Sequence, residues 1–292
     1  MKTKSKLIGH LLALGAAIVW GTSFISTKTL LPDFSPFEIL FLRFTVGYLA
    51  LWVIFPHKVK IKTAREELYL FIAGFAGVSL YFLCENTALI YTYASDVSVL
   101  VSIAPFLTGL LAHFLTSEKL KKTFVLGFFV SIIGIVLISY NGSAVLHLNP
   151  LGDILAILAA FLWAIYSIYT NKVSEHSYPI IGVTRRIFFY GILTMIPMMF
   201  FMDFHIETAD LLHKSNLFNL LYLALIASAV CYIAWNKAMD ILGAVKASVY
   251  IYLIPVVTMI FSFFLLGENI TVIMLIGTAF ILGGLFLSER KK

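Results

Sequence analysis

Ten long stretches of mostly apolar residues make up most of this chain. An α-helix needs roughly 20 apolar residues to cross the hydrocarbon core of a bilayer. The composition fits a lipid environment, because 61% of the residues are hydrophobic and 12% are charged, whereas a soluble domain carries roughly 25% charged residues. The sequence therefore predicts an all-α integral membrane protein with ten transmembrane helices, at about residues 7–27, 36–55, 67–90, 95–116, 123–141, 151–171, 179–201, 216–236, 244–266 and 271–288.

If successive helices cross the membrane in alternating directions, most lysine and arginine residues of the connections and termini lie on one side of it. Cytoplasmic loops carry an excess of such residues, and the opposite side holds only Lys28 and Lys214 among the connections. Both termini are therefore expected in the cytoplasm, because the N-terminal side holds Lys2, Lys4, Lys6, Lys58, Lys60, Lys62, Arg65, Lys119, Lys121, Lys122, Lys172, Lys237, Lys246, Arg290, Lys291 and Lys292.

The first apolar stretch is long for the core of a signal peptide, and no polar secreted domain follows it. We expect it to remain as a helix rather than to be cleaved. The sequence shows no organelle-targeting signal, which favours the inner (cytoplasmic) membrane of a bacterial cell.

The two halves of the chain repeat one another. The number of residues that separates matched positions changes once along the chain. This change requires a net insertion of seven residues in the second half, for which the connection at 202–215 has room. We expect two repeats, 1–145 and 146–292, each with five helices. Because five is odd, the second repeat is inverted in the membrane, a common plan for secondary transporters. Duplication for packing alone is the alternative. The matched pairs before the change are Trp20 and Trp163, Pro36 and Pro179, and Arg43 and Arg186, and those after it include Asn86 and Asn236, and Pro105 and Pro255.

The motifs of both halves resemble those of EamA-type members of the drug/metabolite transporter superfamily, over nearly the whole chain. The resemblance implies a ten-helix fold, with a central cavity lined mainly by the helices at 7–27, 67–90, 95–116, 151–171, 216–236 and 244–266. It also implies export or exchange of amino acids and related metabolites. The segments that carry it are Ala-Ala-Ile-Val-Trp-Gly (16–21), Ala-Leu-Ile-Tyr-Thr (88–92), Ser-Ile-Ala-Pro (102–105), Ser-Glu-Lys (117–119), Asn-Lys-Ala (236–238), Tyr-Leu-Ile-Pro (252–255) and Leu-Gly-Glu-Asn-Ile-Thr (266–271).

Polar and aromatic residues on those helices are the candidates for the wall of a substrate cavity. Aromatic walls with a single carboxylate suit an apolar or aromatic amine, through stacking and cation–π contact. The same aromatic residues also suit interfacial belts or packing. The candidates are Trp20, Ser23, Tyr81, Glu85, Asn86, Ser98, Ser102, Trp163, Tyr166, Trp235, Asn236, Ser248 and Tyr252.

Four charged residues within or beside the predicted helices are candidates for ion pairing or proton coupling: Arg43, Glu85, Asp96 and Arg186. Arg43 and Glu85 lie at similar depth, and we expect them to be partners or to share a network. Their pair either locks two helices together, or Glu85 takes a proton or a substrate ammonium during transport. Arg186 has no obvious acid at its own depth.

Two prolines at matched positions, Pro105 and Pro255, predict breaks in their helices. Proline removes a backbone donor and frees a carbonyl for substrate or water. The serines that precede them either face the cavity or bond to their own backbone. Glycines at 127, 134, 277, 283 and 284 predict a close helix contact, either within a monomer or between the subunits of a weak homodimer.

The favoured function is a secondary transporter working by alternating access, an exporter or exchanger of small organic metabolites such as amino acids, with protons as a candidate coupling ion. One alternative is an importer of cationic solutes such as choline or polyamines. The other is a membrane enzyme acting on lipid-linked substrates, but such an enzyme needs a cluster of acids or histidines at one membrane face, and this sequence has none. The sequence contains no phosphate-binding loop, metal-ligand spacing or nucleophile elbow, so we expect neither an enzyme nor a cofactor. The basic residues lie in short connections, which disfavours nucleic acid as a partner.

Overall fold

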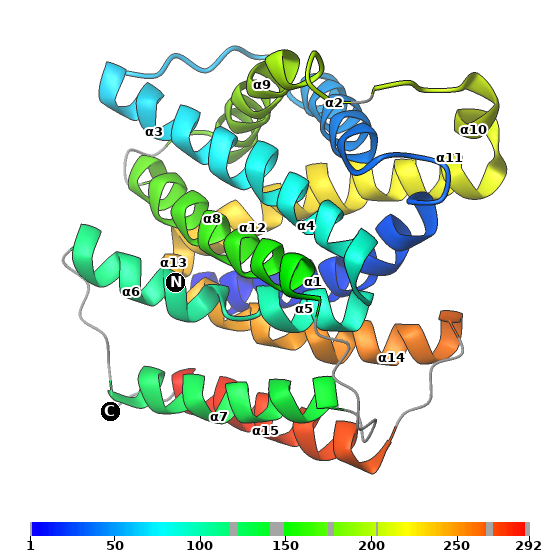
Figure 1. The fold of residues 1–292 in the computed structure, drawn as a ribbon. Coiled ribbons are helices and arrows are strands. Elements are labelled where there is room, and N and C mark those ends of the chain that lie inside the picture. The colour runs from blue at the N-terminus through cyan, green and yellow to red at the C-terminus, as the bar shows by residue number, and fades with distance from the viewer. Residues whose placement is uncertain are drawn as a thin grey trace.

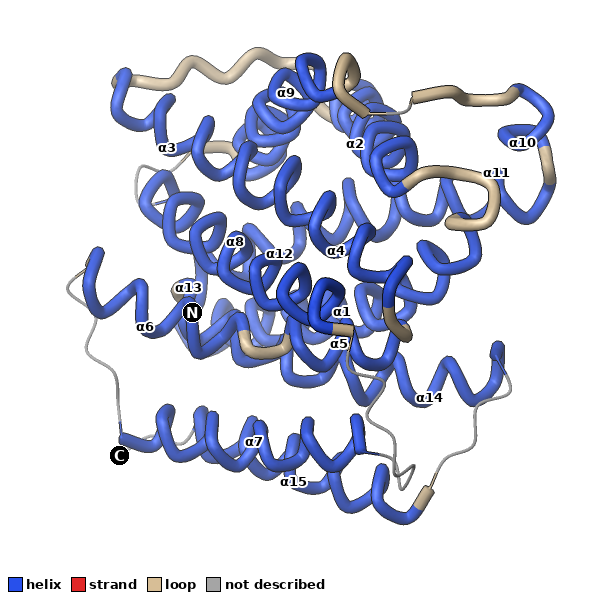
Figure 2. Tube along the Cα trace, viewed as in Figure 1, coloured by secondary structure: helices blue, strands red, loops and turns tan. Residues whose placement is uncertain are grey.

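The computed structural model describes residues 2–116, 122–140, 149–174, 178–202, 204–266 and 271–289, and the regular structure in these ranges is helical throughout (Figure 2). The N-terminal half contains α1 (Lys2–Leu30), α2 (Pro36–Ile54), α3 (Ala64–Gly74), η1 (Phe75–Leu80), α4 (Tyr81–Tyr91), α5 (Ala94–Val101), α6 (Ala104–Leu115) and α7 (Lys122–Tyr140). The C-terminal half contains α8 (Pro150–Ser174), α9 (Ile180–Met198), α10 (Thr208–Leu212), α11 (Lys214–Leu221), η2 (Tyr222–Val230), α12 (Cys231–Leu242), α13 (Ala244–Ser248), η3 (Val249–Leu253), α14 (Ile254–Leu266) and α15 (Val272–Glu289).

Within the described residues, eight helices are long and apolar enough to cross a membrane. This confirms an all-helical membrane protein. Two further predicted stretches, 123–141 and 271–288, correspond to α7 and α15. The eight spans are Lys6–Leu30, Pro36–Ile54, Ala64–Tyr91, Val97–Leu115, Pro150–Val173, Ile180–Met198, Lys214–Leu242 and Ala244–Leu265.

Helices α2 and α3 begin where the sequence carries capping residues. Ser35 precedes α2, and its hydroxyl accepts a hydrogen bond from the backbone N–H of Glu38 at 3.2 Å, while the Glu38 carboxylate accepts from the Ser35 N–H at 2.7 Å. Thr63 and Glu66 form the same reciprocal arrangement before α3. Each box satisfies backbone donors that the first turn of a helix leaves free, and so fixes where the helix starts.

Two of the spans contain a widened, π-helical segment at matched places. The span Ala64–Tyr91 widens at Phe75–Leu80 and the span Lys214–Leu242 widens at Tyr222–Val230. In the register that pairs Asn86 with Asn236, the last residues of the two segments are equivalent to each other. Such segments alter the backbone ladder and present carbonyl groups to side chains, and they are frequent at functional sites.

Two other helices are broken immediately before a proline, as the sequence predicts. The helix containing Ser98 ends at Val101 and resumes with α6, in which Pro105 is the second residue. In the other half, α13 passes into the 3₁₀ segment η3, and α14 resumes with Pro255 as its second residue. Gly243 turns the chain sharply into α13 with φ of 86°, a backbone conformation that glycine adopts without steric cost.

The halves interlock rather than lying side by side. Helix α1 contacts α12, η2 and α14 of the C-terminal half, and α8 contacts α3, α4 and α6 of the N-terminal half. The main hydrophobic core lies between these helices and contains buried side chains from both halves. The sequence predicts the seven-residue insertion in the connection between α9 and α11, and this connection contains the short helix α10 (Figure 1).

Helices α7 and α15 pack against each other along one edge of the molecule (Figure 1), and glycines make the close approach possible. A Cβ atom on Gly134 would lie 2.8 Å from the backbone nitrogen of Ile281 and closer still to the carbonyl oxygen of Gly277. Gly127 and Gly284 face each other in the same way. A Cβ on Gly283 would meet nothing within 4 Å. The glycines that face the neighbouring helix therefore pack helices within one chain.

Replacing Gly134 with Ala should destabilise the protein by about 1–3 kcal/mol, because the added methyl overlaps the backbone of α15. The matched change Gly283→Ala adds the same methyl in open space. It should be neutral or stabilise the helix by up to about 1 kcal/mol. Thermal unfolding of both variants in detergent measures the difference. Equal melting temperatures would show that the α7–α15 contact does not depend on the missing side chain.

Candidate functional site

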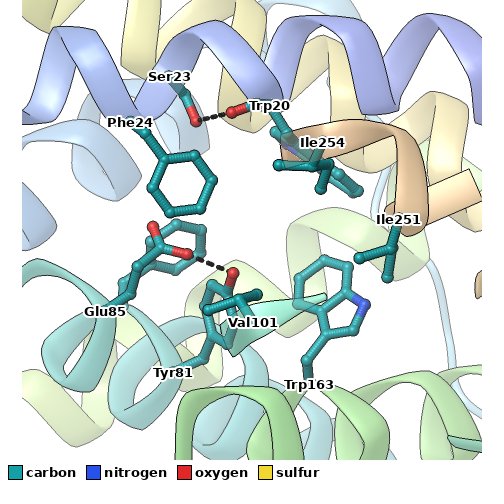
Figure 3. A pocket seen from close by; sticks show the side chains of 10 residues that line it. Trp20, Ser23, Phe24, Tyr81, Glu85, Val101, Trp163, Ile251 and Ile254 are labelled. Atoms are coloured by element: carbon teal, nitrogen blue, oxygen red, sulfur yellow. Dashed lines mark hydrogen bonds between the residues drawn. The ribbon is translucent and has the colours of Figure 1, made fainter. Parts of the chain in front are cut away.

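A pocket lies where α1, α4, α5, α8, η3 and α14 meet (Figure 3). Both halves of the chain contribute to its wall, which is mostly apolar and aromatic. The lining residues are Trp20, Ser23, Phe24, Tyr81, Phe82, Glu85, Val101, Trp163, Ile251 and Ile254.

Glu85 is the acidic residue of the pocket lining. It is buried, and one carboxylate oxygen, Oε2, accepts a short hydrogen bond from the hydroxyl of Tyr81, one helical turn earlier on α4 (Figure 3). Ser23 also lines the pocket, and its hydroxyl donates to the carbonyl of Trp20 on its own helix. A carboxylate among apolar walls within a membrane span is costly unless a cation or a proton neutralises it. The pocket is therefore suited to binding a positive charge.

Aromatic rings from four helices pack against one another in the pocket wall and behind it. The rings of Trp20 and Trp163 meet edge to face, with centroids 5.1 Å apart and planes at 85°. Tyr81 lies 5.1 Å from Trp163, and Trp235 lies 5.0 Å from Trp20. Such tilted and edge-to-face pairs are favourable for aromatic side chains. Trp20, Tyr81 and Trp163 line the pocket and give it a rigid wall with π-faces able to contact a cation, and Trp235 packs against this wall without lining the pocket.

Two hydrogen bonds connect aromatic side chains to backbone carbonyls at equivalent positions of the two widened segments. The indole N–H of Trp20 donates to the carbonyl of Ala227 at 2.9 Å, and the hydroxyl of Tyr232 donates to the carbonyl of Gly77 at 2.9 Å. The two acceptors are equivalent positions of the repeat, one in η2 and the other in η1. Each bond joins one half of the chain to the other, so the same groups that shape the pocket also hold the halves together.

Arg43 lies directly behind Phe82. It is fully buried, its guanidinium carbon lies 4.1 Å from the centre of the Phe82 ring, and its Nε donates to the Ser228 hydroxyl at 3.0 Å. The Nη1 and Nη2 atoms have no hydrogen-bond partner within the described structure. No described hydrogen bond joins Arg43 to Glu85, whose carboxylate is bonded to Tyr81 instead. Within the described structure the two side chains therefore form no direct ion pair, and an attraction between them at longer range stays a prediction.

The sequence comparison decides the family. The model of the EamA-like transporter family matches residues 7–140 and again 150–290. The chain belongs to the EamA-like transporter family. An uncharacterized transporter of Archaeoglobus fulgidus is 28% identical, with 97% of this chain and 98% of the relative covered. A Salmonella typhimurium protein named "Probable amino-acid metabolite efflux pump" is 27% identical, with 95% and 93% covered.

The fold is also that of a solved crystal structure, with a TM-score of 0.74 at 18% identity and 98% of both chains covered. The family and these named relatives are transporters and not enzymes. Among the described residues, no three His, Cys, Asp or Glu side chains gather as metal ligands would.

Several residues expected from the sequence of this EamA-like protein meet in the pocket. Trp20, Ser23, Tyr81, Glu85 and Trp163 line it. Tyr166 and Trp235 stand behind Trp163, with ring centroids 4.7 Å and 6.0 Å from it.

The asparagine pair lies outside the pocket lining. Asn86 donates to the carbonyl of Pro36 at 3.1 Å, and Asn236 donates to the hydroxyl of Thr184 at 2.9 Å and accepts from Tyr166. Each asparagine joins its helix to the start of the neighbouring α2 or α9. Their sequence match therefore reflects an equivalent packing contact in each half rather than the pocket wall.

The polar residues before the prolines are likewise turned away from the pocket. Ser98, Ser102 and Ser248 donate to carbonyls three or four residues earlier on their own helices. Tyr252 is buried in a second cluster, together with residues of α7 and α15. The side chain of Asp96 lies outside the described part of the structure.

Arg186 forms an ion pair, with an acid that the sequence did not suggest. Its Nε lies 2.6 Å from the Glu67 carboxylate of α3, on a partly exposed surface away from the pocket. The neighbouring Arg185 is the buried residue. It donates to the carbonyls of Phe55 and His57 at the end of α2 and covers the ring of Trp52 at 3.6 Å. A basic side chain satisfies free carbonyls at a helix C-terminus.

Sequence reasoning missed half of the lining and part of the aromatic wall. Phe24 follows Trp20 by one helical turn, and Phe82 precedes Glu85 by three residues, so helical spacing from the predicted residues could have found both. Ile251 and Ile254 stand within four residues of Pro255, but apolar residues carry no signal that separates a pocket wall from a lipid-facing surface. Tyr232 of the aromatic wall occupies the position equivalent to Phe82, so the repeat itself could have found it.

A double-mutant cycle tests the attraction between Arg43 and Glu85. Arg43→Met and Glu85→Gln should each leave the other charge uncompensated in the membrane interior, and the double variant should leave neither. The unfolding free energies should therefore be non-additive by about 1 kcal/mol or more, measured by denaturation in detergent micelles. Effects that add within about 0.5 kcal/mol would show that the two charges act independently.

Proposed function

We propose that this protein is a secondary transporter with ten membrane-spanning helices, arranged as two inverted five-helix repeats at 1–145 and 146–292. Two observations support the repeats. The family model matches once in each half. Helices α5 and α13 begin at equivalent positions, Ala94 and Ala244, and so do α6 and α14, at Ala104 and Ile254. An odd number of spans per repeat inverts the second copy, which suits alternating access around a site between the repeats.

The substrate proposed is a small amphipathic organic solute that carries an amine, such as an amino acid, which the protein exports or exchanges. The observation that carries this proposal is the carboxylate of Glu85 in an aromatic pocket built from both halves. An ammonium group neutralises the carboxylate while the apolar part of the solute contacts the rings. The amino-acid efflux named for the Salmonella typhimurium relative agrees with this class.

Alternating access takes place at the irregular helices. The broken helices α5–α6 and α13–α14 supply Val101, Ile251 and Ile254 to the pocket wall. A helix with a break can change direction there at less cost than a continuous one. Movement of these segments opens the pocket to one side of the membrane and then to the other. Between substrates, Glu85 takes a proton or relies on the attraction of Arg43 for its neutralisation, which makes protons a candidate coupling ion.

The proposed location is the inner membrane of a bacterial cell, with both termini in the cytoplasm. The basic connections favour this orientation, because cytoplasmic loops are rich in lysine and arginine. The proposed state is a monomer or a weak homodimer, since the close glycine contacts of α7 and α15 are made within one chain.

A second candidate function is import of cationic solutes such as choline or polyamines. The lining of the pocket contains one acidic residue and no basic one among the described residues, so a solute with a positive charge and no negative charge also suits it. The two candidates differ in whether an acceptor group on the solute strengthens binding.

Uptake into proteoliposomes of purified protein tests the proposal. Radiolabelled amino acids, choline and polyamines are supplied with and without a pH gradient. The wild-type protein should show saturable uptake of at least one amine. Glu85→Gln should lower that uptake at least tenfold, because a charge-assisted hydrogen bond contributes about 1.5–3 kcal/mol. A dependence on the pH gradient would identify protons as the coupling ion.

Glu67→Gln is the matched control. Glu67 is a partly exposed carboxylate paired with Arg186 away from the pocket, and such surface pairs contribute little. Its uptake should stay within about twofold of wild type. Undiminished uptake by a folded Glu85→Gln variant would remove the carboxylate from the mechanism. Failure of the wild-type protein to take up any of the solutes would contradict the proposed substrate class.

A further inference from the structure

The indole N–H of Trp163 is a hydrogen-bond donor without a partner in the wall of the pocket. Trp163 lines the pocket, and the residue is 4% exposed. Its Nε1 atom is enclosed and has no acceptor within the described structure. A buried donor that is left unpaired lowers stability by the lost solvation of that group. Buried tryptophan N–H groups therefore usually find an acceptor.

The reason for the missing partner lies in a difference between the two halves. Trp20, the residue equivalent to Trp163 in the first half, donates to the carbonyl of Ala227. By the same repeat, the equivalent acceptor for Trp163 is the carbonyl of Gly77. That carbonyl already accepts the hydroxyl of Tyr232.

The residue equivalent to Tyr232 in the first half is Phe82, which has no hydroxyl, so Ala227 remains available to Trp20. One hydroxyl group thus makes the two tryptophans unequal. Trp20 is held to the scaffold, and Trp163 keeps its donor free of any acceptor among the described residues.

The free donor and the carboxylate lie on opposite sides of the pocket. In Figure 3 the indole nitrogen of Trp163 lies on the edge of the ring turned toward Ile251, across the pocket from Glu85. Ile251 belongs to η3, the segment before the break at Pro255. The pocket therefore has the Glu85 carboxylate, which can bind a cation, at one side and the Trp163 N–H, a hydrogen-bond donor, at the other, with apolar side chains between them.

We propose that the indole N–H of Trp163 is a second ligand subsite, which binds a carboxylate or carbonyl oxygen of a solute whose amine is bound at Glu85. This inference rests on the proposed function and narrows its substrate class. The indole N–H is a donor only, so it selects for an acceptor. Solutes with both an ammonium group and a nearby carboxyl or amide group satisfy both subsites. Simple amines satisfy one.

Three probes with the same ring and amine separate the two subsites. L-Phenylalanine carries a carboxylate, L-phenylalanine amide a neutral carbonyl, and 2-phenylethylamine neither. Their affinities are measured by isothermal titration calorimetry on the purified protein in lipid nanodiscs. The wild-type protein should bind one or both acceptor-bearing probes more tightly than 2-phenylethylamine. The probe with the larger advantage shows whether the subsite prefers a carboxylate or a carbonyl oxygen.

Trp163→Phe keeps an aromatic ring and removes the N–H. It should weaken binding of the preferred acceptor-bearing probe by about tenfold while leaving 2-phenylethylamine within about twofold of wild type. Trp235→Phe is the control, because the Trp235 N–H is also buried and unpaired within the described structure but does not line the pocket. It should leave the order of the three affinities unchanged.

Equal loss for all three probes in Trp163→Phe would overturn the subsite and leave the amine site at Glu85 standing. If that variant does not fold, the wild-type protein decides alone, and equal affinities for the three probes overturn the subsite. Absence of binding for every probe would contradict both the subsite and the proposed substrate class.

Discussion

A polar backbone group in the interior of a membrane needs a partner within the protein, because lipid offers none. This requirement controls where helices of a membrane protein become irregular. In this protein the widened segments η1 and η2 face other helices, and aromatic donors reach their carbonyls: Tyr232 bonds to Gly77, and Trp20 bonds to Ala227. The irregular turns, the contact between the two halves and the pocket wall thus depend on the same hydrogen bonds.

Buried charge follows a similar logic at longer range. Glu85 and Arg43 are both enclosed, and each is bonded to a neutral hydroxyl, Tyr81 and Ser228 respectively. Neither hydroxyl cancels a charge. Because the two side chains form no direct ion pair within the described structure, each stays available to another partner. A carboxylate locked into an ion pair would have little capacity to bind a cationic solute, whereas one that faces only hydroxyl and aromatic groups keeps that capacity.

Differences between the matched positions make the two sides of the pocket chemically unequal. The position equivalent to Glu85 is Trp235, and the position equivalent to Phe82 is Tyr232. Duplication therefore supplies a scaffold with two similar halves, and a few substitutions place the carboxylate in one half and the unpaired indole in the other. In the proposed binding mode, a solute between them would meet a different chemical group at each end, which a strictly symmetric site would not provide.

The sequence by itself determined the helical membrane class, the eight spans that the structure describes and the breaks before Pro105 and Pro255, because apolar length and proline geometry are local properties. It also identified Trp20, Tyr81, Glu85 and Trp163 as pocket residues, since polar and aromatic groups in such helices are conspicuous. Only the tertiary structure decided which side of each helix meets the pocket. Asn86 and Asn236 bind neighbouring helices, Arg186 pairs with Glu67, and Arg43 stands behind Phe82 instead of touching Glu85. These outcomes depend on helix rotation and on contacts between distant segments, and residue spacing along one helix does not specify either.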